Sequence, residues 1–142
     1  MFKTILVPTD ASESAQCALL LIAIDLAKEF GSRIVLLHVV YTPEALGYTL
    51  SNGITVPQEE IGIYGQEALT ATLDGIDPGD VPIEKKQKPG HPAATILKEI
   101  ENGQFDLVVM GSRGYGPITG PLLGSVSQQV ISKTQCPVMI VK

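Results

Sequence analysis

The sequence predicts an α/β protein with a doubly wound parallel sheet, and three observations support this fold class. Short apolar runs alternate with longer segments whose apolar residues have helical spacing. Several of these runs are apolar almost throughout, which is typical of strands buried on both faces of a parallel sheet. Glycines and prolines stand where the helical segments begin or end. Because parallel strands are joined by right-handed crossovers, we expect helices on both faces of the sheet.

Length and composition indicate one folded domain over residues 1–142. The chain is 44% hydrophobic and 18% charged, a globular composition, and it is long enough to bury a core without disulfides or metals. Its net charge of −5 argues against a protein that binds nucleic acid or an anionic membrane through general electrostatics. We expect neither a signal peptide nor a membrane span, and therefore a cytoplasmic protein.

The first strand and the first helix are predicted for residues 4–7 and 12–30. Pro8 closes the strand, because a proline cannot donate a hydrogen bond to a sheet ladder. Apolar residues at helical spacing mark the inner face of the helix. Gly31 follows the end of this helix, where a left-handed residue is favoured.

The middle of the chain continues the alternation. Residues 34–40 form an apolar second strand. Residues 41–57 are irregular and long for a connecting loop, and residues 58–73 follow as the second helix. The third strand, residues 81–88, is polar and lysine-rich, as an exposed sheet edge is. We interpret three side chains as guards of that edge: Lys85, Lys86 and Lys88.

The last third of the chain contains two helices and two strands. Residues 92–102 form a helix with a proline in the favoured first position. Residues 106–110 form a buried strand that runs into a glycine-rich loop, residues 111–123. Residues 125–133 form the fourth helix, and Val138–Val141 is the last strand.

The glycine-rich loop is the segment that points most directly to function. Ligands of open parallel sheets bind beyond the carboxyl ends of the strands, where the winding reverses. Glycines let backbone N–H groups approach a ligand closely, and a helix beginning at Ser125 adds free N–H donors with roughly half a positive charge. Ser125 and Ser127 would add hydroxyl donors to this anion cradle. The alternative is a surface loop whose glycines only serve turns.

The glycine spacing is neither a Walker A sequence nor GxGxxG. It resembles the Gly-x2-Gly-x9-Gly-Ser/Thr pattern of the ATP-binding branch of the universal stress protein family. The matching residues are Gly111, Gly114, Gly124 and Ser125. Further landmarks of the family occur in the same order: the opening stretch from Ile5 to Glu13, Leu37-His38-Val39, Gly90-His91-Pro92 and Cys136-Pro137-Val138.

This resemblance implies a Rossmann-like five-stranded sheet of order 3-2-1-4-5 that binds ATP, ADP or AMP, with Mg²⁺ accompanying the phosphates. It also implies a role for each matching residue. The nucleoside would lie against Pro8, Thr9 and Asp10, with Val39 meeting the adenine through its backbone and Met110 near the base. Ribose and phosphates would be held by Gly111, Gly114, Gly124, Ser125 and Val126. Arg113, the only cation nearby, either pairs with a phosphate or faces solvent.

Other polar residues have simpler interpretations. Asp10 and Glu13 fit a capping box at the start of the first helix, which is compatible with a binding role for Asp10. We interpret His38 as a hydrogen-bonded histidine of the core or rim, because no catalytic partner stands near it. We expect His91 to be exposed. The two cysteines, Cys17 and Cys136, are interpreted as buried free thiols.

We therefore predict a dimeric, ATP-binding stress-response or regulatory protein without catalytic or metal-ligating residues and with slow or no hydrolysis. The apolar strand Val138–Val141 lacks edge-guarding lysines before Lys142, which favours a homodimer through this strand, a pairing that the resemblance also implies. An interaction domain of the same fold, which binds an unknown protein partner and no nucleotide, is the alternative. A transferase that uses ATP and needs a partner to complete its site is a third.

Overall fold

Five parallel strands form one sheet in the order β3-β2-β1-β4-β5, which confirms the predicted fold class and strand order. The computed structural model describes residues 2–41, 58–113 and 123–142. The strands are β1 Thr4–Thr9, β2 Arg33–Val40, β3 Ile83–Pro89, β4 Leu107–Gly111 and β5 Val138–Val141. The helices are α1 Glu13–Cys17, α2 Ile24–Phe30, α3 Gln58–Leu73, α4 Pro92–Asn102 and α5 Ser125–Lys133.

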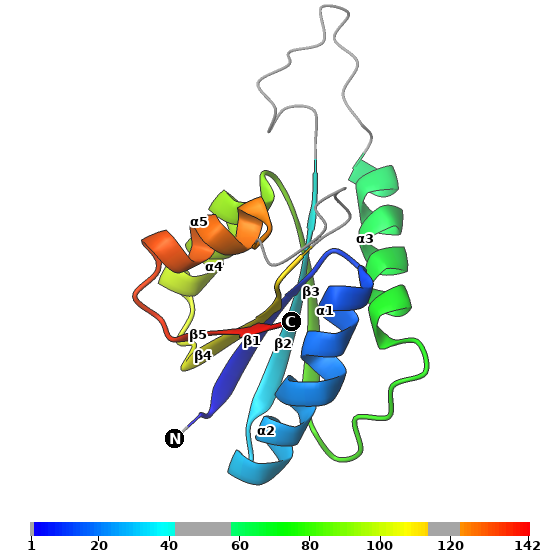
Figure 1. The fold of residues 1–142 in the computed structure, drawn as a ribbon. Coiled ribbons are helices and arrows are strands. Elements are labelled where there is room, and N and C mark those ends of the chain that lie inside the picture. Colours follow the sequence, from blue (N-terminus) through cyan, green and yellow to red (C-terminus); the bar gives the residue numbers. More distant parts are fainter. Residues whose placement is uncertain (1, 42–57, 114–122) are drawn as a thin grey trace, which may run out of the picture.

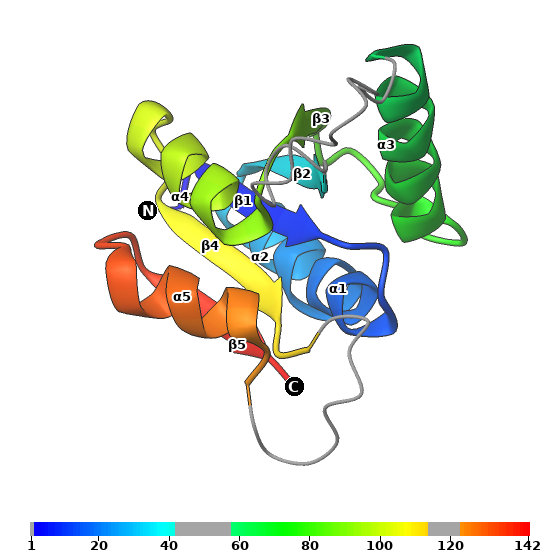
Figure 2. The ribbon, with the colours of Figure 1, turned by 90° about the horizontal axis from the view of Figure 1, so that it is seen from above.

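Helices cover both faces of the sheet, as the alternating pattern predicts (Figure 1). Helices α4 and α5 lie side by side on one face, and α1, α2 and α3 lie on the other (Figure 2). In the part of the chain that the structure describes, no helix is long and apolar enough to span a bilayer.

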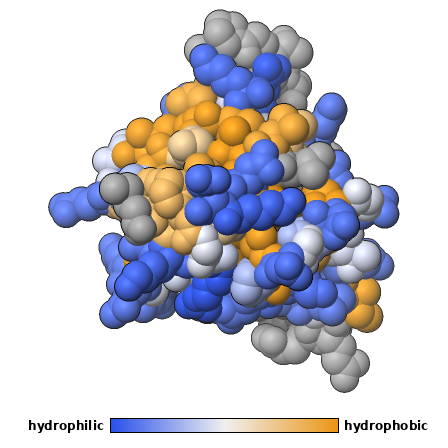
Figure 3. Space-filling view, turned by 90° about the horizontal axis from the view of Figure 1, so that it is seen from below, coloured by the Kyte–Doolittle hydropathy of each residue, from blue (hydrophilic) through white to orange (hydrophobic). Residues whose placement is uncertain are grey.

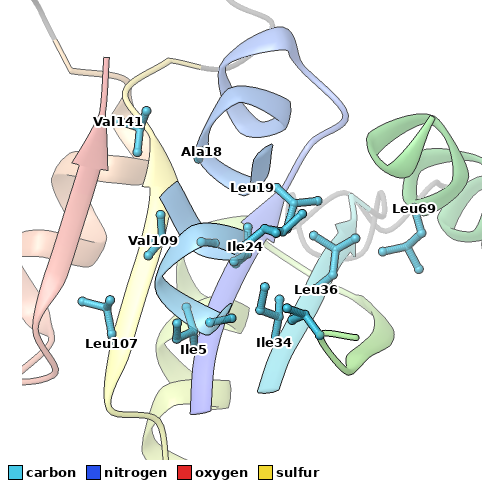
Figure 4. Packing of buried hydrophobic residues seen from close by; sticks show 14 residues of the cluster. Ile5, Ala18, Leu19, Ile24, Ile34, Leu36, Leu69, Leu107, Val109 and Val141 are labelled. Atoms are coloured by element: carbon cyan, nitrogen blue, oxygen red, sulfur yellow. The ribbon is translucent and has the colours of Figure 1, made fainter. Parts of the chain in front are cut away.

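Each face of the sheet has its own hydrophobic core, because successive strand residues point to opposite faces. On the face of α1 and α2, Ile5, Leu36 and Val109 are buried together with Leu19 and Ile24 (Figure 4). The alternate strand residues form the second core with α4 and α5. This second cluster consists of Leu6, Val35, Leu37, Val39, Ile96, Val108, Met110 and Val130. Burial on both faces explains the continuous apolar runs of the central strands.

The first helix is capped by Ser12, so the predicted capping box of Asp10 and Glu13 is wrong. Ser12 has the extended backbone of an N-cap, and its hydroxyl accepts from the Ala15 N–H at 3.2 Å. The preceding residue, Ala11, has a φ of +64°. This left-handed residue turns the chain, so that the Asp10 side chain accepts from the Ser12 N–H at 2.9 Å instead of capping the helix.

The predicted helix 12–30 is one continuous helix but is not α-helical throughout. Its middle, Ala18–Ala23, is π-helical and joins α1 to α2. The Ile24 N–H accordingly donates to the Leu19 carbonyl, five residues back. The helix ends as predicted, because Gly31 has a φ of +65° and closes it in the left-handed conformation.

The first strand was predicted to end at residue 7, before Pro8, but β1 continues to Thr9. Its register with β4 includes only Ile5 and Leu6, whereas its register with β2 continues to Thr9 opposite His38. A proline is tolerated here because this end of β1 has a strand partner on one side only. Strands β1 and β4 therefore separate toward their carboxyl ends, which opens the sheet at the point where the winding reverses (Figure 2).

The other boundaries follow the predictions closely. Helices α3, α4 and α5 have the predicted bounds. Strand β3 begins at Ile83 rather than at residue 81, because the Val81 N–H donates to the Pro78 carbonyl in a turn. Apart from Tyr41, the irregular segment 41–57 lies outside the described residues, as does most of the glycine-rich loop.

Cys17 and Cys136 are free thiols, as predicted, but both are half-buried rather than buried. Burial raises the pKa of Cys136, and the nearby charge of Asp106 raises it further. The Cys136 thiol also donates to the Phe105 carbonyl at 3.5 Å. These features are typical of a structural thiol and not of a nucleophile.

Candidate functional site

A cavity of about 370 Å³ lies at the carboxyl edge of the sheet, where β1 and β4 separate. Among the described residues, eleven of the twelve predicted site residues line it. They are Pro8, Thr9, Asp10, Val39, Met110, Gly111, Arg113, Gly124, Ser125, Val126 and Ser127. The twelfth, Gly114, lies outside the described residues. The structure thus brings together residues from both ends of the chain.

Four further residues line the cavity and were missed by the sequence analysis: Ala15, Leu37, Pro92 and Ile96. Two sequence signals point to three of them, and none points to Ala15. Leu37 lies two residues before Val39 and therefore on the same face of β2. Pro92 and Ile96 are four residues apart on α4 and therefore share one side of that helix. The side chains of Leu37, Pro92 and Ile96 form the wall of the cavity on the side of α4 and β2.

The turn after β1 forms the polar side of the cavity. Asp10 is exposed, and one carboxylate oxygen accepts from the Ser12 N–H. Thr9 has a different role, because its hydroxyl accepts from the Ala11 N–H at 2.9 Å and lies 2.7 Å from the Thr72 hydroxyl of α3. The Thr72 hydroxyl donates to the Ala68 carbonyl, so Thr9 is the donor in this pair. The Thr9 side chain therefore anchors the turn to α3.

Helix α5 begins at the opposite side of the cavity without a side-chain cap. Its N-cap is Gly124, whose N–H donates to the Ser112 carbonyl at 2.8 Å. The first N–H groups of a helix have no acceptor within the helix. Here these groups belong to residues 125–127, which line the cavity. The α5 start therefore presents hydrogen-bond donors and the positive end of a helix dipole to the cavity.

Ser127 is buried, and its hydroxyl donates to the Gly111 carbonyl at 3.0 Å. This bond fastens the start of α5 to the end of β4. The hydroxyl hydrogen is thus engaged inside the protein, so the prediction that Ser127 donates it to a ligand is wrong. The exposed Ser125 keeps its predicted position at the helix start.

Gly111 is required by the approach of β4 to α1. A Cβ atom at this position would lie 2.7 Å from the backbone carbonyl carbon and oxygen of Ser14. The neighbouring Arg113 N–H donates to the Ser14 hydroxyl at 3.3 Å, and the Arg113 side chain is exposed beside the cavity. The absence of a side chain at Gly111 therefore has a packing reason that is independent of any ligand.

The two histidines lie outside the cavity lining. Nδ1 of His38 lies 2.8 Å from the Thr9 carbonyl, and since a carbonyl only accepts, His38 is the donor. The interpretation of His38 as a hydrogen-bonded histidine is confirmed. His91 is half-buried rather than exposed, with its ring 5.8 Å from that of Tyr41.

The charges around the cavity are few. Asp10 is the one carboxylate and Arg113 the one cation among the described lining residues. Over residues 2–41, 58–113 and 123–142, no three His, Cys, Asp or Glu side chains gather in a way that could hold a metal ion. The described lining thus offers helix N–H groups and apolar surface, together with one carboxylate and one guanidinium group.

A parallel sheet of this order, with a cavity where the winding reverses, defines a Rossmann-like α/β protein. A family model described as "Universal stress protein family" matches residues 1–142, and the chain belongs to this family.

Individual relatives agree with this assignment. Universal stress protein MJ0531 of Methanocaldococcus jannaschii is 34% identical over 143 residues, which cover 100% of this chain and 83% of that protein. The solved structure of MJ0577 from the same organism has a TM-score of 0.76 at 28% identity, covering 100% of this chain and 96% of that one. A family member from Arabidopsis thaliana, solved with AMP bound, has a TM-score of 0.62 at 23% identity and covers 99% and 91% of the two chains. This last likeness is one of fold.

Proposed function

We propose that the protein is a single-domain adenine-nucleotide-binding module of a stress response, that it acts in the cytoplasm, and that ATP is its ligand. One observation carries this proposal. An apolar wall and an uncapped helix start face the same cavity, and the cavity volume of about 370 Å³ is in the range of small-molecule sites. An apolar wall suits a nucleobase, and helix N–H groups suit phosphates. The AMP-bound structure of the Arabidopsis relative supports the choice of ligand class.

The base would lie between Leu37 and Val39 of β2 and the first turn of α4. The β2–β3 ladder supports a backbone contact from Val39. The Val40 carbonyl accepts from the Gly90 N–H on the β3 side. Because backbone groups alternate along a strand, the Val39 carbonyl turns to the other side, where β1 has ended at Thr9. This carbonyl would accept a hydrogen bond from the amino group of adenine.

The phosphates would lie at the start of α5. Gly124 leaves this approach free of a side chain, and the N–H groups of residues 125–127 would donate to phosphate oxygens. Arg113 would add a positive charge, and Asp10 would accept from the ribose hydroxyls. Mg²⁺ would enter with the triphosphate, because the described residues form no cluster that could hold the metal alone.

The site is suited to recognition rather than to fast chemistry. Asp10 is the one carboxylate of the described lining, and it would be occupied by the ribose. Efficient phosphoryl transfer needs a positioned base and ligands for Mg²⁺. We therefore expect ATP hydrolysis slower than about one turnover per second. A transferase that is completed by a partner remains an alternative, and labelled ATP incubated with cell extract would reveal a labelled partner.

Nucleotide binding is tested with freshly purified protein and with thermal melts in added ATP. The chain has no tryptophan and four tyrosines, so bound adenine would stand out in its ultraviolet spectrum. ATP at a hundredfold excess over its dissociation constant should raise the free energy of unfolding by about 2.7 kcal/mol. The variant Gly124→Val should lose this gain, because its side chain would occupy the approach of the phosphates. Gly124 has φ −64° and ψ 158°, which valine also adopts, so the variant should fold.

The matched control is Ser132→Val, which places the same side chain at an exposed position of α5. This control should keep the ATP-dependent gain. Wild-type protein that carries no adenine and shows no gain with ATP, while remaining folded, would overturn nucleotide binding. That result would favour the alternative, an interaction domain of the same fold.

We also propose that the protein forms a homodimer through β5. The carbonyls of Pro137 and Val141 accept from the β4 side, so the alternate residues Val138 and Ile140 turn their backbone polar groups to the open edge. Seen from below, apolar side chains gather over one side of the molecule (Figure 3). Two exposed apolar side chains flank the β5 edge: Met139 of β5 is 37% exposed, and Leu21 of the adjoining π-helical segment is 56% exposed. An unguarded edge of this kind favours pairing with a second copy.

The homodimer is tested by sedimentation of Met139→Lys at tens of micromolar. Across a two-fold axis, the strand of one copy would bring its new charge close to that of the other, so the variant should sediment as a monomer. Ile131→Lys is the control, since Ile131 is a similarly exposed apolar residue of α5. This control should remain a dimer. A wild-type monomer under these conditions would contradict the proposal.

A further inference from the structure

A buried carboxylate joins α4 to the edge strand β3. The side chain of Glu99 is 5% exposed, and its two carboxylate oxygens are held by two lysines of β3. Lys86 Nζ lies 3.0 Å from Oε1 and Lys88 Nζ lies 2.7 Å from Oε2. We call Lys86, Glu99 and Lys88 the triad. All three lysines of β3 were predicted to guard the sheet edge, but two of them, Lys86 and Lys88, are bound to Glu99.

The register of the sheet places the triad beside the cavity. Lys86 pairs with Leu37 and Lys88 pairs with Val39, the two residues of β2 that line the cavity. Paired residues of neighbouring strands share one face of the sheet. Glu99 follows Ile96, another lining residue, by one turn of α4. The triad therefore fastens α4, which carries lining residues of the cavity, to β3, the strand next to β2, which also carries lining residues.

Lys85 offers a natural contrast within the same strand. Strand alternation turns its side chain to the opposite face from Lys86 and Lys88. It is exposed, and it forms no ion pair with any residue in the described part of the chain. Loss of Lys85 removes the same charge from the same strand as loss of Lys88 does. The two lysines therefore differ in their link to α4 while their contributions to net charge are equal.

We propose that Lys86 and Lys88, through Glu99, position α4 for nucleotide binding and thereby set the affinity of the base-binding side of the cavity. The three are positioning residues, since none of them lines the cavity. This inference rests on the proposed function. Where α4 is docked for only part of the time, the apparent dissociation constant rises in inverse proportion to the docked fraction. The base-binding wall of Pro92 and Ile96 would move with the helix.

The test is calorimetric titration of wild type, Lys86→Met, Lys88→Met, Lys88→Arg and Lys85→Met with ATP and with AMP, far below the melting temperature. Lys86→Met and Lys88→Met should each raise the dissociation constant about fivefold, as expected for an α4 docked about one fifth of the time. The factor should be equal for ATP and AMP, because both share the base and differ in charge. Lys88→Arg should restore binding, and Lys85→Met should stay within about twofold of wild type.

Amide hydrogen exchange without ligand gives the second measurement. Protection of α4 should fall in Lys88→Met and persist in Lys85→Met. Equal weakening by Lys85→Met and Lys88→Met, or a larger loss for ATP than for AMP, would show an effect of net charge and overturn the inference. So would wild-type affinity in Lys88→Met. A wild-type protein that binds neither nucleotide would overturn the proposed function and the positioning role with it.

Discussion

Replacing Gly111 with alanine should lower the free energy of unfolding by about 1–3 kcal/mol, the usual cost of an overpacked site. The new Cβ atom would lie 2.7 Å from the carbonyl carbon and oxygen of Ser14. These are backbone atoms of α1, so no side-chain rotation relieves the contact. Either β4 or α1 must move, and the cavity between the β1–α1 turn and the start of α5 would change with it.

Urea denaturation measures this effect, and Gly62→Ala is the control. Gly62 lies in α3, and a Cβ atom there would have no neighbour within 4 Å. Alanine is favoured over glycine in a helix by about 1 kcal/mol, so this control should be as stable as wild type or more stable. Wild-type stability of Gly111→Ala would show that the close approach of β4 to α1 is not required. Loss of ATP binding in such a stable variant would then assign Gly111 to ligand approach instead.

Removing both lysines of the triad should lower the free energy of unfolding at pH 7 by about 3 kcal/mol, because Glu99 would remain buried and ionised without a partner. Partial exposure of the two lysines places this value at the low end of the range for buried pairs. Burial by itself raises the pKa of Glu99. The hydrogen bonds from Lys88 and Lys86, together with their positive charges, outweigh burial and hold the pKa of Glu99 below its ordinary value of 4.5.

The sign of the pH dependence follows from this direction. A carboxyl whose pKa is lower in the folded state stabilises the protein above pH 4.5, and this contribution is lost as the pH falls through the folded pKa. In Lys86→Met/Lys88→Met, burial raises the pKa of Glu99 and no lysine lowers it. Protonation of Glu99 in acid removes the buried charge, so it should reduce the loss of stability of the variant. The stability difference from wild type should therefore be largest near neutral pH. It should begin to shrink above pH 4.5, as Glu99 of the variant becomes protonated, and continue to shrink below pH 4.5 as the wild type loses its own contribution.

Urea denaturation of both proteins from pH 7 downward measures this difference. Lys85→Met should stay within about 0.5 kcal/mol of wild type throughout, because it breaks no ion pair with a described residue. A difference between wild type and the double variant that does not change with pH would show that Glu99 is not its source.

Much of the fold can be predicted from the sequence because its signals are local. Alternating apolar runs identify the strands, and Gly31 and Pro92 mark a helix end and a helix start through their own backbone preferences. The strand order required the family resemblance, since spacing alone does not say which strands are neighbours. Local signals also misplace the first cap. Asp10 and Ser12 are both good caps, and the left-handed turn at Ala11 selects Ser12.

The residues of the candidate site also fall into two groups, those that local sequence signals identify and those that depend on tertiary packing. The glycine pattern and the residues at the ends of β1 and β4 are readable in the sequence, because they stand at the end of a recognisable strand or at the start of a recognisable helix. Leu37 and Ile96 become lining residues only when the strands separate and α4 lies over β2. The bonds from Ser127 to Gly111 and from Thr9 to Thr72 join segments far apart in the chain.

The sequence by itself determined the class of fold, most of the helix boundaries and the segment that carries the glycine pattern, because periodicity and backbone preference act within a few residues. Only the tertiary structure decided how the charged residues are used. Lys85, Lys86 and Lys88 look alike in the sequence, yet strand alternation turns two of them toward α4 and one away. The buried partner Glu99 comes from a different element, so its contacts depend on the packing of α4 against the sheet.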